Sequence, residues 1–187
     1  MTDAPDPGPD VVRLTRRVVY ENAWMTVTED EVRHLDGTMG VYGVVHSRDF
    51  AVVIPFDGRR YHLVEQYRYP VGARYWEFPQ GSIAHEPDAA PEAIAAAELA
   101  EETGLRAATL TPLGRLHYGY GRSTNSFTVF LATGLTAGPA DPDHEEQGMR
   151  TDAFTLDEVW QMVDDGRITD AQTLAALALL GRSRAPG

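Results

Sequence analysis

The sequence contains no cysteine, which excludes thiol catalysis, disulfide bonds and cysteine-based zinc sites. It also has no apolar run near the roughly 20 residues that a membrane-spanning helix needs. Its first residues lack a basic stretch followed by an apolar one, so they indicate no targeting signal. We therefore expect a cytoplasmic protein without a membrane partner.

Positive charge is scarce, since the 187 residues carry a formal net charge of −12. Such a surface repels nucleic acid polymers, although a small anionic ligand remains possible where cations gather locally. The length suits one domain with its own apolar core. We predict a disordered tail at residues 1–12 and a single domain at residues 13–182.

The segment 91–103 has an alanine-rich, helix-forming composition and contains no lysine or arginine. It does contain Glu98, Glu101 and Glu102, whose spacings of three and four residues predict one common helix face. Like charges at these spacings cost a few tenths of a kcal/mol per pair. One interpretation is a solvated charged face. The other is a divalent cation site, because Mg²⁺ prefers oxygen ligands and carboxylates one turn apart can share it.

Short runs of strand-forming residues fill the stretch from 18 to 78. Two Asp-Gly pairs, at 36–37 and 57–58, separate such runs, and this dipeptide is a strong hairpin signal. We therefore predict antiparallel sheet here, with "FAVVIPF" at 50–56 buried on both faces. Residues 68–90 are predicted to be a long functional loop with at most a short strand at 75–78.

Helix signals dominate the rest of the chain. Pro91 suits the first turn of the helix at 91–103, and Gly104 suits the left-handed residue beyond its end. After a predicted strand at 126–135, Thr155 and Glu158 have the spacing of a capping box for a helix that ends at Gly166. A last helix is predicted from Asp170 to Leu180, with an apolar face formed by Leu174, Leu177 and Ala178. This order of elements indicates an α+β domain.

The stretch "GSIAHEPDAAPEAIAAAELAEETGL" resembles the Nudix box, G-x5-E-x7-R-E-U-x-E-E-x-G-U, where U is aliphatic. The positions that match are Glu98, Leu99, Glu101, Glu102, Gly104 and Leu105. Gly81 lies two residues further upstream than the pattern has it, and alanine stands at 89 and 97 in place of glutamate and arginine. In the family these two residues are thought to pair. Losing both partners of a charge pair is often nearly neutral, so the departure is compatible with an active enzyme.

The resemblance implies an α/β/α sandwich with a mixed sheet, preceded by an antiparallel strand region at residues 13–46. It implies a Mg²⁺ site, with Mn²⁺ as a substitute, whose ligands are the Gly81 carbonyl and the carboxylates of Glu98, Glu101 and Glu102. Glu102 thereby becomes a catalytic residue. In the ADP-ribose pyrophosphatase branch a glutamate from a later loop is the general base, and Glu146, or alternatively Glu145, occupies such a loop. Either residue is equally compatible with a solvated acidic loop.

Two further stretches, "VEQYRYPVGARYWEFPQG" and "GRITDAQTLAALALL", resemble the ADP-ribose and nucleoside-diphosphate-sugar pyrophosphatases. The substrate-binding residues implied are Arg68, Arg74, Glu77, Trp24 and Arg122. The planar guanidinium of Arg68 suits bidentate phosphate binding. Alternatives stay open, because Glu77 is equally suited to pair with Arg68, Trp24 to pack in a core, and the other two arginines to lie on the surface.

The resemblance predicts a homodimer, assembled through residues 13–46, that cleaves a nucleoside diphosphate-sugar. ADP-ribose is the favoured substrate, with AMP and ribose 5-phosphate as products. One alternative is a pyrophosphatase for GDP-mannose or another sugar nucleotide. Others are a nucleotide-binding Nudix module without turnover, which the alanines at 89 and 97 favour, and a purely structural domain, which leaves the three glutamates unexplained.

Overall fold

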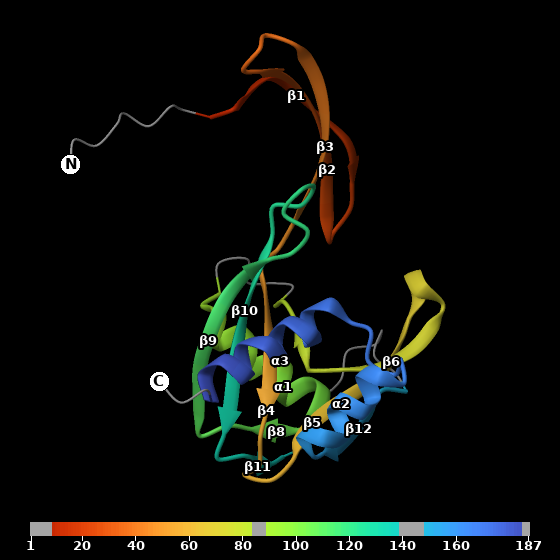
Figure 1. Ribbon diagram of the computed structural model, residues 1–187, viewed down its shortest axis with the longest axis vertical. Coiled ribbons are helices and arrows are strands. Elements are labelled where there is room, and N and C mark those ends of the chain that lie inside the picture. The colour runs from red at the N-terminus through yellow and green to blue at the C-terminus, as the bar shows by residue number, and fades with distance from the viewer. Residues whose placement is uncertain (1–8, 84–88, 139–147, 185–187) are drawn as a thin grey trace, which may run out of the picture. The chain divides into compact units, whose positions relative to one another are not determined.

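The computed structural model describes residues 9–83, 89–138 and 148–184. The chain forms two compact units, one of Met1–Arg48 with His117–Asn125 and the other of Asp49–Leu116 with Ser126–Gly187. Figure 1 shows the succession of elements along the chain. All helices of the described chain belong to the second unit, and none of them is long and apolar enough to cross a membrane.

The first unit is a three-stranded antiparallel sheet in the order β1-β2-β3. Its strands are β1 (Val11–Glu21), β2 (Met25–His34) and β3 (Met39–Ser47). The hairpin predicted at Asp36 and Gly37 is confirmed, since Gly37 has φ +83° and Asp36 Oδ1 accepts a hydrogen bond from the Thr38 backbone N–H at 2.9 Å. Strand β1 begins at Val11, inside the range that we predicted to be a tail.

The second unit contains nine strands within its described residues. They are β4 (Phe50–Pro55), β5 (Tyr61–Arg68), β6 (Ala73–Glu77), β7 (Gln80–Gly81), β8 (Leu105–Arg106), β9 (Thr109–His117), β10 (Ser126–Thr133), β11 (Thr136–Ala137) and β12 (Arg150–Phe154). They pair as a four-stranded sheet β7-β4-β10-β9, a three-stranded sheet β12-β5-β6 and a small pair β11-β8. This mixed arrangement is the sheet layer of the sandwich.

Two of the strand predictions are wrong. Strand β4 is parallel to β10, with Phe50 opposite Phe127, although we expected only antiparallel pairing before residue 78. The stretch 68–90 is also more regular than expected, because the hairpin of β5 and β6 continues to the Arg68–Ala73 pair and closes through the 3₁₀ turn η1 (Tyr69–Val71). Gly72, at φ +66°, caps that turn.

The helices are α1 (Pro91–Thr103), α2 (Leu156–Asp164) and α3 (Ala171–Arg184). The predicted bounds of α1 are confirmed, with Gly104 at φ +71° beyond its end, and so is the capping box of α2. The predicted end of α3 at Leu180 is wrong, because the helix continues through Gly181 to Arg184. A glycine within a helix costs only about 1 kcal/mol, which packing of the buried Leu180 offsets. Ala178 is exposed and so does not belong to the apolar face.

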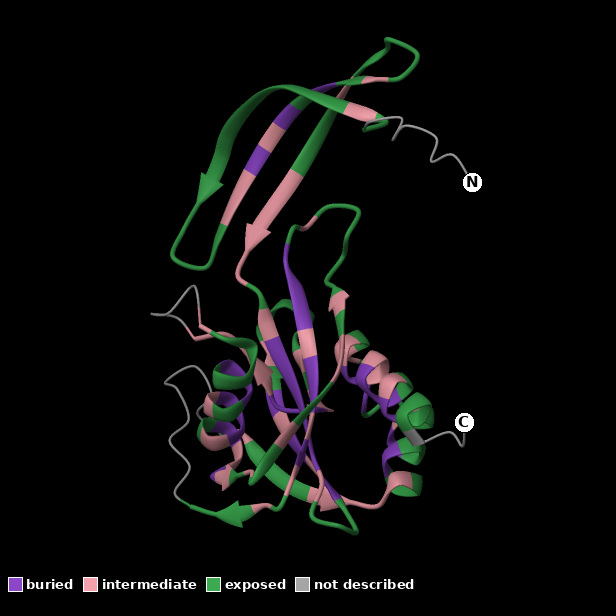
Figure 2. Ribbon diagram, turned by 90° about the vertical axis from the view of Figure 1, so that its left-hand side faces the viewer, coloured by how far each residue is buried: buried purple, intermediate pink, exposed green. Residues whose placement is uncertain are grey.

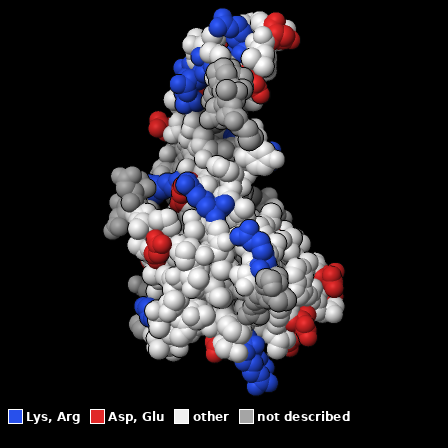
Figure 3. All heavy atoms as spheres, turned by 60° about the vertical axis from the view of Figure 1, so that its left-hand side comes forward, with Lys and Arg blue, Asp and Glu red and all other residues white. Residues whose placement is uncertain are grey.

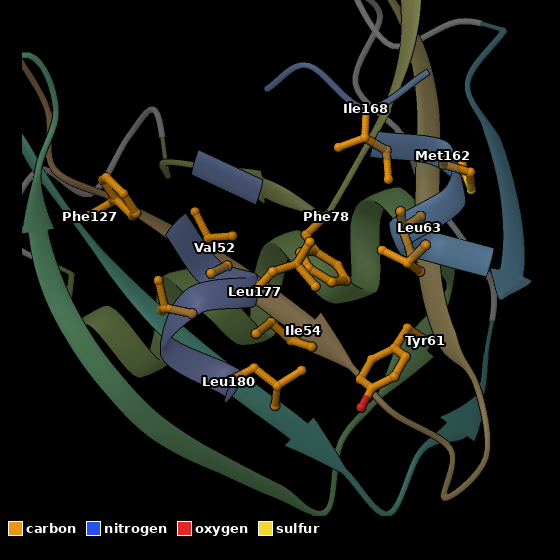
Figure 4. Close-up of a cluster of buried hydrophobic side chains, with 13 residues drawn as sticks. Val52, Ile54, Tyr61, Leu63, Phe78, Phe127, Met162, Ile168, Leu177 and Leu180 are labelled. Carbon is orange, nitrogen blue, oxygen red and sulfur yellow. The ribbon is translucent and has the colours of Figure 1, made fainter. Parts of the chain in front are cut away.

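The alternating side chains of strand β4 connect the two apolar cores of the sandwich. Alternate side chains of a strand point to opposite faces, and Ala51 and Val53 join the core beneath α1, whereas Val52 and Ile54 join the core beneath α2 and α3. Figure 4 shows the second of these cores, and Figure 2 shows the buried central strands between helices on either side. The fold is therefore an α/β/α sandwich of the α+β class, as predicted.

A buried hydrogen bond fixes the segment between β6 and β7. Phe78 has no exposed surface, and its backbone N–H donates to Thr173 Oγ1 of α3 at 3.0 Å. Since this segment joins Glu77 to Gly81, its attachment to α3 determines where both of these residues lie.

Candidate active site

Helix α1 buries two carboxylates against the sheet. Glu98 and Glu102 are only 6% and 4% exposed, and they share a face with the apolar Ile94, Ala95 and Leu99. Glu101 is exposed. A rotation of about 100° per residue places Glu98 and Glu102 within 40° of each other, whereas Glu101 falls on the far side of Glu98. Glu98 and Glu102 therefore face the sheet, and Glu101, a helix-surface neighbour of Glu98, lies at the solvent-exposed edge of this face.

The carboxylate of Glu98 lies directly against Gly81 of β7. A Cβ atom added at Gly81 would be 2.6 Å from Glu98 Oε2 and 2.7 Å from Oε1, which is closer than real atoms approach. Only glycine leaves room for this contact. The structure thus brings together two residues that the resemblance assigned to one metal ion.

The last turn of α1 lies beside the other sheet. The hydroxyl of Thr151 on β12 donates to the backbone carbonyl of Glu102 at 3.4 Å. Thr151 is paired with Val64 of β5, and Val64 is paired in turn with Glu77 of β6. The side chains of Thr151, Val64 and Glu77 therefore share one face of this sheet, and the last turn of α1 approaches that face.

Glu77 and Arg68 form a forked ion pair in which the carboxylate is buried and the guanidinium is partly exposed. Arg68 Nε donates to Glu77 Oε2 at 3.2 Å, its Nη2 donates to Oε1, and Gln66 Nε2 donates to Oε1 at 2.8 Å. The Glu77 side chain is 3% exposed and that of Arg68 39%. Burial raises the pKa of Glu77, and the pull of Arg68 in the opposite direction offsets this only in part. The alternative that Glu77 pairs with Arg68 is therefore the observed arrangement.

The charge around Arg68 extends beyond that pair. Burial acts to lower the pKa of Arg68, but the combined attraction of Glu77, Glu102 and Asp170 outweighs it and raises the pKa above its usual value. Asp170 Oδ2 accepts hydrogen bonds from Gln80 Nε2 at 3.0 Å and from the Thr173 backbone N–H at 2.7 Å. Asp170 thereby caps α3, as predicted, and also holds the residue next to Gly81.

The donor groups fit a hard cation. Within the described ranges, no three His, Asp or Glu side chains are gathered closely enough to form a metal centre on their own. Mg²⁺ does not require one, since it is commonly bound through one or two carboxylates, waters and substrate phosphates. The Glu98 carboxylate lies against Gly81, so it supplies a carboxylate oxygen beside the residue whose carbonyl the resemblance makes a ligand.

Other predicted residues lie elsewhere or outside the described chain. Glu145 and Glu146 fall outside the described residues. Arg74 donates to Glu65 Oε2 at 3.2 Å and to the backbone carbonyl of Gly148, the first described residue after them. Arg74 therefore holds the end of the segment that carries both glutamates.

Trp24 and Arg122 belong to the first unit. Trp24 is 64% exposed, so it does not pack in a core, and its backbone N–H donates to Asn22 Oδ1 at 2.9 Å in the turn between β1 and β2. Arg122 is exposed and lines a cavity of about 490 Å³ together with His117 and Tyr120. Their contribution to substrate binding stays a prediction.

Sequence reasoning missed Gln66, Gln80 and Thr173 as residues that organise the site. All three use polar side chains to hold a neighbouring element, through Glu77, Asp170 and the Phe78 backbone respectively. The one available signal was their placement, because Gln66 and Gln80 lie in the stretch "VEQYRYPVGARYWEFPQG" that carried the second resemblance.

Comparison with known families agrees with this geometry. The NUDIX domain matches residues 45–177, and the nucleoside diphosphate sugar hydrolase N-terminal domain matches residues 12–45. The chain therefore belongs to the Nudix family of hydrolases. Within that family it carries the N-terminal region that the second match describes, so both parts of the predicted resemblance are confirmed.

Curated relatives cover most of the chain. An ADP-ribose pyrophosphatase of Mycobacterium tuberculosis (strain ATCC 25618 / H37Rv) is 33% identical over 172 residues, covering 90% of this chain and 82% of that protein. An ADP-ribose pyrophosphatase of Bacillus subtilis (strain 168) is 29% identical over 138 residues, covering 73% and 74%. A methanol dehydrogenase activator of Bacillus methanolicus is 29% identical over 169 residues, covering 87% and 88%.

A solved structure confirms the fold. The crystal structure of an ADP compounds hydrolase superposes with a TM-score of 0.82 at 21% identity, covering 93% of this chain and 94% of that one. The sandwich and its N-terminal strands therefore recur in a second protein whose sequence has diverged widely.

The contact between Gly81 and Glu98 generates a prediction. Gly81 does not have a positive φ, so Gly81→Ala adds only a methyl group, which must displace the Glu98 carboxylate. We expect roughly a 10- to 100-fold loss of hydrolysis, as for other displaced metal-site groups, with the fold preserved in circular dichroism. The control is Gly181→Ala in α3, where an added Cβ meets nothing within 4 Å. Full activity of Gly81→Ala would contradict the assignment.

Proposed function

We propose that this protein hydrolyses the pyrophosphate bond of a nucleoside diphosphate-sugar, with ADP-ribose as the favoured substrate and AMP and ribose 5-phosphate as products. The carrying observation is the buried Glu98 carboxylate held against Gly81 in a chain of the Nudix family. The names of two curated relatives, both ADP-ribose pyrophosphatases, support the choice of substrate. The match at residues 12–45 supports the wider class of sugar nucleotides.

The proposed cofactor is Mg²⁺, with Mn²⁺ as a substitute, held by the Gly81 carbonyl and by Glu98 and Glu102, with Glu101 as an additional ligand. When bound, such a cation neutralises phosphate oxygens and lowers the pKa of a water for in-line attack. The protein's part is to keep the two buried carboxylates oriented, which the packing of Leu99 and Ala95 on the same helix face achieves. Glu101 is exposed, and we assign it to a second ion or to a metal-bound water.

Among the arginine side chains, we propose Arg68 as the main contact to the substrate phosphates. Glu77, which Gln66 holds by a hydrogen bond, fixes the Arg68 guanidinium, yet 39% of the Arg68 side chain stays exposed, so part of the group remains accessible to an anion. Glu77 then contributes to substrate binding by orienting Arg68. Arg74, Arg122 and Trp24 complete the proposed set.

Figure 3 shows charge of both signs in several separate groups on one face of the molecule, among much uncharged surface. With a net charge of −12, this pattern suits a small anionic substrate better than a nucleic acid polymer. The absence of cysteine suits a reducing cytoplasm, which is the location that we propose.

The decisive experiment is a product assay. ADP-ribose, GDP-mannose, UDP-glucose, NADH and diadenosine polyphosphates are each incubated with the protein, with and without Mg²⁺, and the products are separated by chromatography. We expect Mg²⁺-dependent release of AMP from ADP-ribose. Preferential cleavage of GDP-mannose would transfer the assignment to another sugar nucleotide, and binding without turnover would show a nucleotide-binding module.

The same assay tests the carboxylates. Glu102→Gln keeps the size of the side chain but removes its charge, so we expect kcat to fall by more than about 100-fold, the upper range for groups that only support a metal. Glu92→Gln, in the exposed first turn of the same helix, is the control and should retain activity. Unchanged turnover in Glu102→Gln would exclude it as a ligand.

A second pair of variants locates the general base. Because a positioned base contributes typically 10²- to 10⁴-fold, Glu146→Gln should lower kcat by about that factor and leave Mn²⁺ binding unchanged. Glu145→Gln is the matched control one residue away. If Glu145→Gln alone is impaired, the two roles are exchanged, and if neither variant is impaired the base lies outside this loop.

We also propose a homodimer assembled through residues 13–46. The first unit exposes many apolar side chains, including Val18 at 57%, Met39 at 61% and Val41 at 64%. Exposed apolar surface of this extent is typical of an interaction site. Light scattering should give a dimer for the wild type and a monomer for Val41→Asp. The control is Val71→Asp, because Val71 is 65% exposed but lies in the second unit. A monomeric wild type would contradict this assembly.

A further inference from the structure

The burial of Glu98 and Glu102 in α1 has an electrostatic cost. These carboxylates are four residues apart on one face of α1 and are 6% and 4% exposed. Buried charges require a compensating charge, and α1 contains neither lysine nor arginine. The compensation must therefore come from another element.

Strand β5, which packs against α1, carries the cation Arg68. Arg68 is the last residue of this strand. Glu102 is attached to the neighbouring β12 through Thr151, and Glu77 lies on β6 at the opposite side of β5. Arg68 is four residues from Val64, so its side chain shares the sheet face of Thr151, Val64 and Glu77 that the last turn of α1 approaches, and it reaches Glu77 through hydrogen bonds.

Glu77 is not the only negative charge that acts on the Arg68 guanidinium. Attraction by Glu102 and Asp170, in addition to Glu77, contributes to the raised pKa of Arg68. An arginine stays charged at any physiological pH, so it supplies a permanent positive charge even when half-buried. Glu77 holds this guanidinium through hydrogen bonds, and the charges of Glu102 and Asp170 also attract it, which leaves a negative surplus for another cation to balance.

We propose that Arg68 is the internal counter-cation of the candidate metal site, where it neutralises Glu102 as well as Glu77 until a divalent ion binds. This inference rests on the proposed metal site. It assigns Arg68 a positioning role in addition to any contact with phosphate. Two consequences follow. Stability depends on Arg68 more strongly without metal than with it, and Arg68 opposes metal binding through its like charge.

The test must separate this role from the pair with Glu77. Removing Arg68 alone leaves Glu77 buried without its partner, which destabilises the protein whatever else Arg68 does. The comparison is therefore between Glu77→Gln and the double variant Arg68→Met/Glu77→Gln. Melting temperatures are measured for both in EDTA and in saturating Mn²⁺, and Mn²⁺ binding is measured by calorimetry without nucleotide.

If Arg68 neutralises Glu102, the double variant melts about 3 °C or more below Glu77→Gln in EDTA, and the gap closes in Mn²⁺. Adding Glu102→Gln to both variants abolishes the gap in EDTA. The double variant also binds Mn²⁺ roughly threefold to tenfold more tightly, as expected when a nearby like charge is removed. A double variant that is as stable as Glu77→Gln in EDTA overturns the proposal, because Arg68 then serves Glu77 alone.

A matched control exists in the first unit. Arg16 and Asp30 form a similar forked pair, with hydrogen bonds of 2.7 Å and 2.6 Å and side chains 37% and 7% exposed. Any difference between Asp30→Asn and Arg16→Met/Asp30→Asn should be the same in EDTA and Mn²⁺. If the wild type binds no Mn²⁺, the proposed metal site is wrong and the metal-linked half of the inference falls with it. The order of stability in EDTA still decides whether Arg68 neutralises Glu102.

Discussion

The burial of Glu98 and Glu102 on α1 is the constraint to which the rest of the second unit is fitted. Each carboxylate is more than nine-tenths buried on a face that otherwise packs alanine, isoleucine and leucine against the sheet. Such a face stabilises the helix through apolar contact and destabilises it through charge. The surrounding elements accommodate the charge, because Gly81 gives Glu98 room, and β5 and β12 lie beside Glu102.

A chain of polar contacts transmits this constraint to the opposite layer of the sandwich. Thr173 of α3 accepts from the Phe78 backbone, and Asp170 at the start of α3 accepts from Gln80. Gly81 follows Gln80 directly, so the helix on one face of the sheet positions the residue that contacts Glu98 from the helix on the other face. The core shown in Figure 4, with Phe78 and Leu177 in contact with β4 residues, holds that link rigid.

Local signals in the sequence were sufficient for the elements that carry the site but not for their partners. The bounds of α1 follow from Pro91 and Gly104, and the start of α2 from its capping box, because each signal involves residues within one turn of another. The parallel pairing of β4 with β10 depends on residues far apart in the chain, and no turn encodes it. Spacing alone also grouped Glu101 with the buried pair, since only the position of the sheet distinguishes the two flanks of a helix face.

Charge balance also explains why the two departures from the Nudix box are compatible with a metal site. Alanine at 89 and 97 removes a glutamate and an arginine together, so neither leaves an uncompensated partner. The helix nevertheless retains its two buried carboxylates, and the cation that we propose to balance Glu102 is Arg68, from a different element. The Arg68 guanidinium is oriented by its hydrogen bonds to Glu77, which Gln66 holds in turn, rather than by the helix. The sequence of the box alone therefore does not reveal the positive charge of this site, because the residue that supplies it, Arg68, lies on β5.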